Sequence, residues 1–520
     1  MTEAGSSRPI INPWIIAITV MLSTFLEVLD TSVVNVSLPH IAGSLSATVD
    51  EATWVLTSYL VANAIVLPIT GWLANRFGRK RLLITAVSGF TLASLLCGIA
   101  PTLPALVVFR IIQGATGGAL QPISQAILLE SFPPQDRGKA MAFWGLGIVC
   151  APILGPTLGG WLTDAYSWRW VFYINLPIGI ASVFMTRAYI FDPAYIKRQA
   201  GKVDFWGLGM LAVGISALQI VLDKGQEADW FGSNYIIALT VLAAVLLTAF
   251  VFWELTVKHP IVHLSVFKDR TYATGVFLMT LLGFVLYGSL VLLPIFMQTL
   301  LNYTAVAAGI WTSPRGIGAL IFMPVTGILM SRRWDPRLLL GLGLVAGAMS
   351  MFEFSHFTLQ TSPWGFFWAQ ILQGAALSFI FVPLTTVTMD GVSNSEMGNA
   401  TSLFNLLRNL GGGAGISAMT TLVARRSQFH QARLTAQLSS SNIGVHAFLA
   451  QLQAGFIARG ENAVTAGRQA LGGLYGLVAQ QAALLSFMES FWLLALIFTV
   501  MVPLVLLMRR PTHGRSVSAH

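Results

Sequence analysis

Charged residues are scarce in this chain. Asp, Glu, Lys and Arg make up 10% of its 520 residues, whereas hydrophobic residues make up 55% and the mean hydropathy is +0.72. Water-soluble domains carry about 25% charged residues. The composition therefore excludes a water-soluble globular protein and predicts an all-α polytopic membrane protein.

Residues for catalysis and metal binding are also lacking. The two cysteines, Cys97 and Cys150, both lie inside apolar runs and predict no disulfide framework. No GxxxxGK[ST] sequence offers a phosphate cradle, and no HExxH or Cys/His cluster offers a metal site. We expect no enzyme, no cofactor, no metal and no nucleic-acid partner, and an energy source other than ATP.

Long apolar runs fill most of the chain. A membrane-spanning helix needs about 20 apolar residues, and fourteen stretches qualify. They lie near residues 14–38, 51–74, 82–100, 104–130, 139–163, 170–191, 204–223, 234–256, 271–299, 304–330, 338–356, 364–390, 399–424 and 486–508.

The basic residues predict how these spans are oriented. With a cytoplasmic N-terminus, the connections on the cytoplasmic side hold 20 of the 30 Lys and Arg residues. Cytoplasmic connections of membrane proteins carry such an excess. Both termini are therefore expected in the cytoplasm, and the net charge of +9 needs no nucleic acid to explain it.

Two internal repeats divide the chain. Pro68-Ile-Thr-Gly71 returns 256 residues later as Pro324-Val-Thr-Gly327, and the string that begins at Ile111 returns at Ile371, an offset of 260. Spans 1–6 therefore correspond to spans 9–14. We predict a six-helix bundle at 1–191, two inserted helices at 192–270, a second six-helix bundle at 271–508 with a long periplasmic loop at 425–485, and a cytoplasmic tail at 509–520.

Asp30 is the strongest candidate for chemistry. It lies roughly 24 Å along the first span at 1.5 Å per residue, and a carboxylate at that depth normally marks an ion or proton path. Glu27 lies one turn earlier on the same face. The alternative is a structural carboxylate that accepts hydrogen bonds, for example from Thr31 or Asn35.

Two arginines lie in or beside apolar spans near polar residues. Arg110 begins span 4, where a fixed cation could tune a protonatable carboxylate, or could instead snorkel towards the outer end. Arg408 in span 13 has the same two interpretations. The weaker candidates for a substrate cavity are Asn35, Asn63, Gln113, Gln121, Trp144 and Arg408.

Span 5 carries small residues at every fourth position. Gly147, Ala151, Gly155 and Gly159 form one smooth face, and Pro152 and Pro156 interrupt the backbone hydrogen bonds nearby. This face predicts either plain helix packing or a gating seam, with candidate residues Gly155, Pro156, Gly159 and Gly160.

Several of these segments resemble one known family. Residues 71–82, 106–118 and 147–160 resemble the loop 2–3, span 4 and span 5 signatures of the major facilitator superfamily. Residues 29–39 and 168–179 are similar to its 14-span drug:proton antiporter branch. The resemblance implies the major facilitator fold, with two pseudo-symmetric six-helix bundles plus two inserted helices.

The resemblance also implies a function. Members of this branch are proton-driven exporters of hydrophobic drugs in the bacterial inner membrane, and some work with a periplasmic adaptor protein and an outer-membrane channel. Its loop 2–3 signature implies gating roles for Gly71, Arg76, Gly78 and Arg79. The signature usually has Asp where this chain has Asn75, which weakens any latch that needs a charge there.

The sequence thus predicts a proton-coupled antiporter that exports hydrophobic compounds by alternating access. Asp30 would exchange a proton for substrate, with Arg110 and Glu27 setting its proton affinity. Two other functions stay open. One is a proton-coupled uptake symporter on the same fold, and the other is a membrane scaffold or sensor in which the acids are structural.

Overall fold

A computed structural model describes residues 12–192, 204–258, 260–436, 438 and 443–509 of the chain. The N-terminal leader, most of the 192–203 connector and the tail after residue 509 lie outside these residues. Within the described part every regular element is a helix. The first bundle contains α1 (Pro13–Ser44), α2 (Val49–Ala52), α3 (Trp54–Phe77), α4 (Arg79–Gly98), α5 (Leu103–Gly117), α6 (Leu120–Ser131), α7 (Arg137–Ala165), α8 (Trp170–Tyr173) and α9 (Asn175–Tyr189).

The inserted pair and the second bundle follow. The pair is α10 (Phe205–Lys224) and α11 (Asn234–Thr256). The second bundle contains α12 (Arg270–Leu300), α13 (Ala305–Thr312), α14 (Pro314–Ser331), α15 (Pro336–Phe354), α16 (Pro363–Asp390), α17 (Met397–Ala436), α18 (Ile443–Ile457) and α19 (Ala463–Leu504). Short 3₁₀ turns lie at Trp230–Gly232, Leu264–Lys268 and Val505–Leu507.

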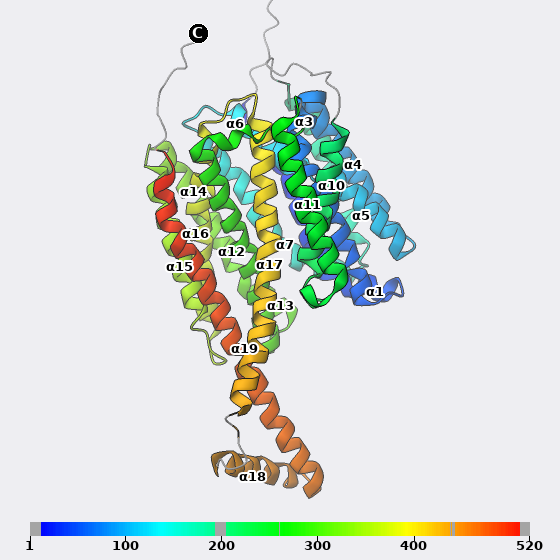
Figure 1. Ribbon diagram of the computed structural model, residues 1–520, viewed down its shortest axis with the longest axis vertical. Coiled ribbons are helices and arrows are strands. Elements are labelled where there is room, and N and C mark those ends of the chain that lie inside the picture. The colour runs from blue at the N-terminus through cyan, green and yellow to red at the C-terminus, as the bar shows by residue number, and fades with distance from the viewer. Residues whose placement is uncertain (1–11, 193–203, 259, 437, 439–442, 510–520) are drawn as a thin grey trace, which may run out of the picture.

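The expected spans appear as helices. Thirteen helical segments among the described residues are long and apolar enough to cross a membrane. The predicted span at 399–424 lies in α17, which is more polar and falls outside that set, yet α17 runs the length of the bundle beside α12 (Figure 1). Helix α17 therefore occupies the fourteenth spanning position. Neighbouring helices surround it where a more apolar helix would face lipid.

Three predicted spans are each split into two helices. The breaks fall at Gly118–Ala119 between α5 and α6, at Ile174 between α8 and α9, and at Ser313 between α13 and α14. Proline explains the third break, because Pro314 opens α14 and lacks the N–H that a continuous helix would need.

The sequence repeat is visible in the packing. In the first bundle α1 packs on α7, α3 on α5, and α4 on α5 and α9. In the second bundle α12 packs on α17, α14 on α16, and α15 on α16 and α19. Each contact in one bundle has its counterpart in the other, as the 256- and 260-residue offsets predict. The inserted α10 and α11 pack on each other, and α10 also lies against α3 and α17.

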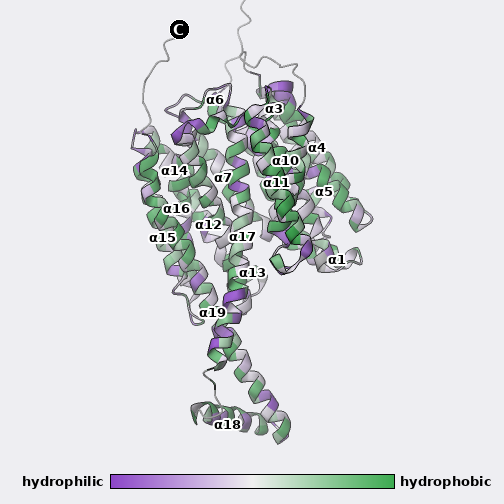
Figure 2. Ribbon diagram, in the orientation of Figure 1, coloured by the Kyte–Doolittle hydropathy of each residue, from purple (hydrophilic) through white to green (hydrophobic). Residues whose placement is uncertain are grey.

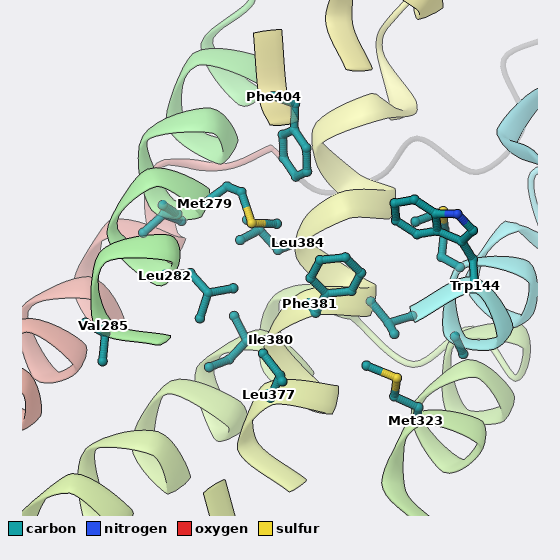
Figure 3. Packing of buried hydrophobic residues seen from close by; sticks show 14 of the residues in the cluster. Trp144, Met279, Leu282, Val285, Met323, Leu377, Ile380, Phe381, Leu384 and Phe404 are labelled. Atoms are coloured by element: carbon teal, nitrogen blue, oxygen red, sulfur yellow. The ribbon is translucent and has the colours of Figure 1, made fainter. Parts of the chain in front are cut away.

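The two bundles meet along α7 and α17. Helix α7 contacts α14 and α16, whereas α17 contacts α3 and α6. Figure 3 shows the buried apolar side chains at this boundary, where Trp144 of α7 faces Phe381 of α16. The two rings are stacked with centroids 6.2 Å apart. Apolar burial therefore holds the bundles together here.

The segment 425–485, predicted as a long loop, is mainly helical where it is described. Helix α17 continues to Ala436, α19 begins at Ala463, and α18 lies between them, so the three helices form a stalk that projects from the bundle (Figure 1). At the base of the stalk Arg426 donates two hydrogen bonds to Glu489, at 2.6 and 2.7 Å. Alanine and glutamine are abundant in this segment and favour helix.

Figure 2 shows the expected distribution of hydropathy. Hydrophobic residues cover most of the bundle, and hydrophilic ones gather at its two ends and at the base of the stalk. The end at the top of Figure 1 carries the turn between α3 and α4, and the opposite end carries α18.

Candidate functional site

Asp30 is the centre of a buried polar cluster in the first bundle. Its Oδ2 accepts a hydrogen bond from Arg110 Nη1 at 2.6 Å. Its Oδ1 accepts hydrogen bonds from Gln113 Nε2 at 2.9 Å and from Asn175 Nδ2 at 2.7 Å. Three helices thus converge, because Asp30 lies on α1, Arg110 and Gln113 on α5, and Asn175 begins α9.

Arg110 is held on several sides. Its Nε donates to the Val55 carbonyl at 3.0 Å and its Nη1 also donates to Gln113 Oε1 at 2.7 Å. Its guanidinium lies over the Tyr59 ring at 4.1 Å from the ring centroid. This position is inconsistent with a snorkelling arginine, because its side chain is completely buried.

Burial gives this cluster its chemical character. Asp30, Arg110, Gln113 and Asn175 each have 0% relative exposure. A buried ion pair is stable only when further hydrogen bonds compensate for the lost water. Here two amides and one guanidinium donate to the carboxylate, while Arg110 Nη2 has no partner among the described residues. The hydrogen bonds of the Asp30 carboxylate thus link α1 to α5 and α9.

Two members of the cluster were not among the sequence candidates. Asn175 bonds Asp30 directly, and Ser94 of α4 accepts hydrogen bonds from Gln113 at 2.6 Å and from Asn175 at 3.2 Å. The one sequence signal that Asn175 and Ser94 share is that each is a polar residue inside an apolar span. Asn175 also lies in the 168–179 segment that carried the family resemblance, so it was open to prediction, whereas a serine in a span is too common to single out.

Glu27 belongs to a second cluster, which joins the two bundles. Asn63 Nδ2 donates to Glu27 Oε1 at 2.9 Å. Arg408 of α17 donates to Gln121 of α6 and interacts electrostatically with Glu27. The other carboxylate oxygen, Glu27 Oε2, and Arg408 Nε have no hydrogen-bond partner among the described residues. An acid of the first bundle thus interacts electrostatically with a cation of the second.

The sequence candidates therefore divide between two sites. Gln113 completes the Asp30 cluster, while Asn63, Gln121 and Arg408 surround Glu27. Trp144 is buried in the apolar boundary, where its Nε1 donates to Thr24 at 3.0 Å. Asn35 is exposed on α1. It lies on the same face of the helix as Val28, two turns earlier, which lines a cavity between the bundles.

The turn between α3 and α4 closes one end of the boundary. Arg79 is buried, pairs with Glu130 of α6 and donates to the Asn394 carbonyl of the second bundle at 3.3 Å. Gly71 lies against α17, where an added Cβ would be 2.6 Å from the Asn399 backbone. Both residues thus bridge the bundles at this end.

The rest of this turn is local structure. Gly78 has φ of +88°, a conformation that favours glycine. Asp192 lies beside it and accepts a hydrogen bond from the Lys80 backbone N–H at 2.9 Å. The guanidinium of Arg76 lies 5.3 Å from the centroid of the Trp72 ring, and Asn75 is half-buried.

The small-residue face of α7 packs inside the first bundle. An added Cβ would lie 2.4 Å from Ser32 at Gly155 and 2.8 Å from the Val33 carbonyl at Gly159, both on α1. At Gly160 it would meet nothing within 4 Å. Pro156 instead faces a cavity between the bundles. The glycines therefore allow α1 and α7 to touch, and a gating role for them stays a prediction.

Two cavities lie at the boundary between the bundles. The larger has a volume of about 110 Å³, and the smaller, of about 30 Å³, shares several wall residues with it. Shared walls come from α7 and α12, for example Val149 and Tyr287. Arg408 lines the smaller cavity and Arg315 the larger. Of the six predicted cavity residues only Arg408 lines these two cavities, so contact of the others with substrate stays a prediction.

Metal chemistry finds no support in the described residues, where no group of three or more His, Cys, Asp or Glu side chains could hold an ion. The polar atoms of both clusters are amides, hydroxyls, guanidinium groups and single carboxylates. Such groups bind protons and polar or charged parts of small molecules.

Sequence comparison agrees with this architecture. The family model described as "Major Facilitator Superfamily" matches residues 20–416. The chain is 40% identical to the fatty acid resistance protein FarB of Neisseria gonorrhoeae, over 96% of each chain. It is 38% identical to the multidrug export protein EmrB of Escherichia coli K12, over 96% of this chain and 95% of that protein.

Solved structures share the fold at low sequence identity. The human organic anion transporter MFSD10 superposes with a TM-score of 0.58 at 13% identity, over 94% of this chain and all of that one. A double-tryptophan mutant of XylE superposes with a TM-score of 0.59 at 17% identity, over 94% and 98%. With its paired bundles, its inserted helices and these relatives, the chain belongs to the major facilitator superfamily.

Proposed function

We propose that this protein is a proton-coupled antiporter that exports hydrophobic compounds by alternating access between its two bundles. The observation that carries the proposal is the saturated, fully buried carboxylate of Asp30 and its single cation, Arg110. The relatives named for multidrug export and for fatty acid resistance support hydrophobic cargo. The apolar walls of the boundary cavities suit such cargo.

Protonation of Asp30 would couple to movement through its partners. The carboxylate joins α1 to α5 and α9, and α1 also carries Glu27, which interacts with Arg408 of the second bundle. A proton on Asp30 weakens its bond to Arg110 and frees α1 to shift. Because Glu27 lies one turn away on the same helix, such a shift changes the contact between the bundles.

The boundary between the bundles is closed at the end that carries the α3–α4 turn. Arg79 and Gly71 join the bundles at the α3–α4 turn. Both termini are proposed to be cytoplasmic, from the distribution of Lys and Arg. The closed end would then face the cytoplasm of a bacterium, and the protein would lie in its inner membrane. The proton gradient is the proposed energy source, and no cofactor is involved.

The stalk is the proposed contact with a periplasmic adaptor, which would connect the transporter to an outer-membrane channel. Helix α18 has no buried residue, and apolar side chains are exposed along the stalk, among them Ile443 at 84%, Val464 at 69% and Tyr475 at 63%. Exposed apolar groups of this kind mark contact surfaces for another protein or for lipid.

Substitution of Asp30 tests the coupling. In proteoliposomes, the Asp30→Asn variant should export a fluorescent hydrophobic dye no faster with a proton gradient than without one, because the amide cannot exchange a proton. The matched control is Asp164→Asn, at an exposed carboxylate on α7. Gradient-driven export by Asp30→Asn at the control rate would eliminate Asp30 as the coupling group.

A further inference from the structure

Arg315 is another buried arginine, and the functions discussed so far do not use it. Its relative exposure is 5%. Its Nε donates to Gln370 Oε1 at 3.0 Å, but both terminal nitrogens, Nη1 and Nη2, have no hydrogen-bond partner among the described residues. Unlike Arg110, it forms no ion pair with any described residue. A buried cation without a counter-ion is costly, so this arrangement requires an explanation.

The sequence repeat shows what Arg315 replaces. Position 315 follows Tyr59 by 256 residues, and position 370 follows Arg110 by 260. The structure confirms this match, because an added Cβ at Gly114 would lie 2.3 Å from the Tyr59 carbonyl and one at Gly374 would lie 2.0 Å from the Arg315 carbonyl. The second bundle thus carries its arginine on α14 instead of α16.

The counter-ion has no such replacement. In the first bundle Gln113 donates to Asp30, whereas in the second its counterpart Gln373 donates to Ser289 of α12 at 3.0 Å. A neutral hydroxyl therefore occupies the place of the carboxylate. The second bundle thus repeats the cation and one glutamine of the first, but no acid pairs with its cation among the described residues.

The surroundings of Arg315 are open on one side and apolar. Arg315 lines the cavity of about 110 Å³ between the bundles, together with Val28, Pro152, Leu286 and Tyr287 among others. The amide nitrogen of Gln370, Nε2, also has no partner among the described residues. It belongs to the carboxamide whose oxygen, Oε1, accepts from Arg315 Nε. The free polar atoms of the Arg315–Gln370 pair are therefore all N–H donors.

We propose that Arg315 binds the carboxylate of an amphipathic organic anion whose apolar body lies between the two bundles. A carboxylate only accepts hydrogen bonds, and the planar guanidinium can donate to both of its oxygens. One cation balances one negative charge, which favours a monocarboxylate over a dianionic phosphate. The cavity of about 110 Å³ is smaller than the roughly 300 Å³ of drug-sized pockets, and Nη1 and Nη2 are themselves buried. The carboxylate therefore binds in a conformation in which the bundles have moved apart enough to expose these two nitrogens.

This inference deepens the proposed function, on which it rests for transport, but binding tests it directly. The probes are decanoate and decanol, which share an apolar chain and differ in charge at neutral pH. Binding to the purified full chain in detergent is measured by tryptophan fluorescence. We expect Arg315→Gln to bind decanoate about tenfold to a hundredfold more weakly, since a hydrogen bond to a charged group contributes that much, and to bind decanol as the wild type does.

Two further variants sharpen the test. Arg315→Lys keeps the positive charge but loses the planar guanidinium that donates to both carboxylate oxygens. This variant should bind decanoate about tenfold more weakly than the wild type and should still prefer decanoate to decanol. Arg459→Gln removes an exposed arginine at the end of α18 and should leave the binding of both probes unchanged. In the absence of ligand, Arg315→Gln should unfold thermally at the wild-type temperature or above it, because it removes a buried uncompensated charge.

Two results would overturn the proposal. They are wild-type affinity of Arg315→Gln for decanoate, and an equal loss of decanoate and decanol binding, whatever the unfolding temperature. Binding at equilibrium needs no proton gradient. A wild-type protein that prefers decanoate but shows no gradient-driven export would therefore contradict the antiporter and leave the Arg315 site standing.

Discussion

At the scale of single residues, two arginines in related positions have opposite surroundings. Arg110 is surrounded by acceptors, among them Asp30, Gln113 and the Val55 carbonyl. Arg315 has one acceptor, Gln370. Arg110 Nη2 has no partner among the described residues, but Nε and Nη1 bind three acceptors, one of them a carboxylate. An arginine held in this way stabilises the packing of its neighbours and can regulate a protonatable group beside it. An arginine with free donors is prepared for a ligand.

Asn175 offers a residue-scale test of the Asp30 cluster. Replacing it with Leu removes one of the two amides that bond Asp30 Oδ1. The pH profile of gradient-driven export should then differ from that of the wild type, because Asn175 bonds the carboxylate that is proposed to exchange the proton. The measurement is dye export from proteoliposomes across a pH series.

The control for this variant is Asn234→Leu, at an exposed position that begins α11. It should keep the wild-type pH profile. An unchanged profile in Asn175→Leu, with export otherwise intact, would show that Asn175 has only a packing role.

At the scale of helices, glycines decide where two backbones can touch. Gly71 lets α3 approach α17 across the boundary, whereas Gly155 and Gly159 let α7 approach α1 within one bundle. Glycine therefore allows close packing both between the bundles and within one bundle, and the sequence alone does not show which of the two a given glycine serves. Only contacts across the boundary change when the bundles move.

Gly71→Val tests the boundary contact. The added side chain would meet the Asn399 backbone at 2.6 Å or less, so α3 and α17 must separate at the closed end. Thr401 is completely buried there and bonds the Pro122 carbonyl. In a chain with Cys97 and Cys150 replaced by Ala, a cysteine at position 401 should react faster with a water-soluble maleimide when Gly71→Val is present.

The matched control is Gly160→Val, since an added Cβ there meets nothing within 4 Å. It should leave the labelling rate at position 401 unchanged. Equal rates in the two variants would mean that Gly71 does not hold the bundles together.

At the scale of the whole molecule, the stalk is separable from the transport unit. Helix α18 contributes no buried residue, while the bundles share an extensive apolar core (Figure 3). Replacing 443–457 with a short Gly/Ser linker should leave dye export in proteoliposomes at the wild-type rate. If the stalk binds an adaptor, the same variant should lower drug resistance in whole cells that contain the adaptor.

A parallel loss of export in proteoliposomes would instead place the stalk in the transport cycle. A variant that confers full resistance in whole cells would rule out adaptor binding through α18. Purified protein and intact cells therefore distinguish the two roles.

Much of this protein could be predicted from its sequence alone. Apolar runs long enough to cross a bilayer fix the helices, since a backbone in lipid must satisfy its own hydrogen bonds. The repeats at offsets of 256 and 260 fix the correspondence of the bundles, and the depth of Asp30 in a span identifies it as a candidate. Each of these conclusions depends on local composition or on spacing along the chain.

Other features depend on which helices meet. Glu27 and Asp30 lie one turn apart, yet one faces Arg408 of the second bundle and the other faces Arg110 of the first, because packing places different neighbours beside each turn. Asn175 reaches Asp30, and Ser94 reaches Gln113 and Asn175, only because α1, α4, α5 and α9 converge. The free donors of Arg315 are likewise decided by the tertiary structure, because a missing counter-ion is a property of the packed neighbours and not of the arginine itself.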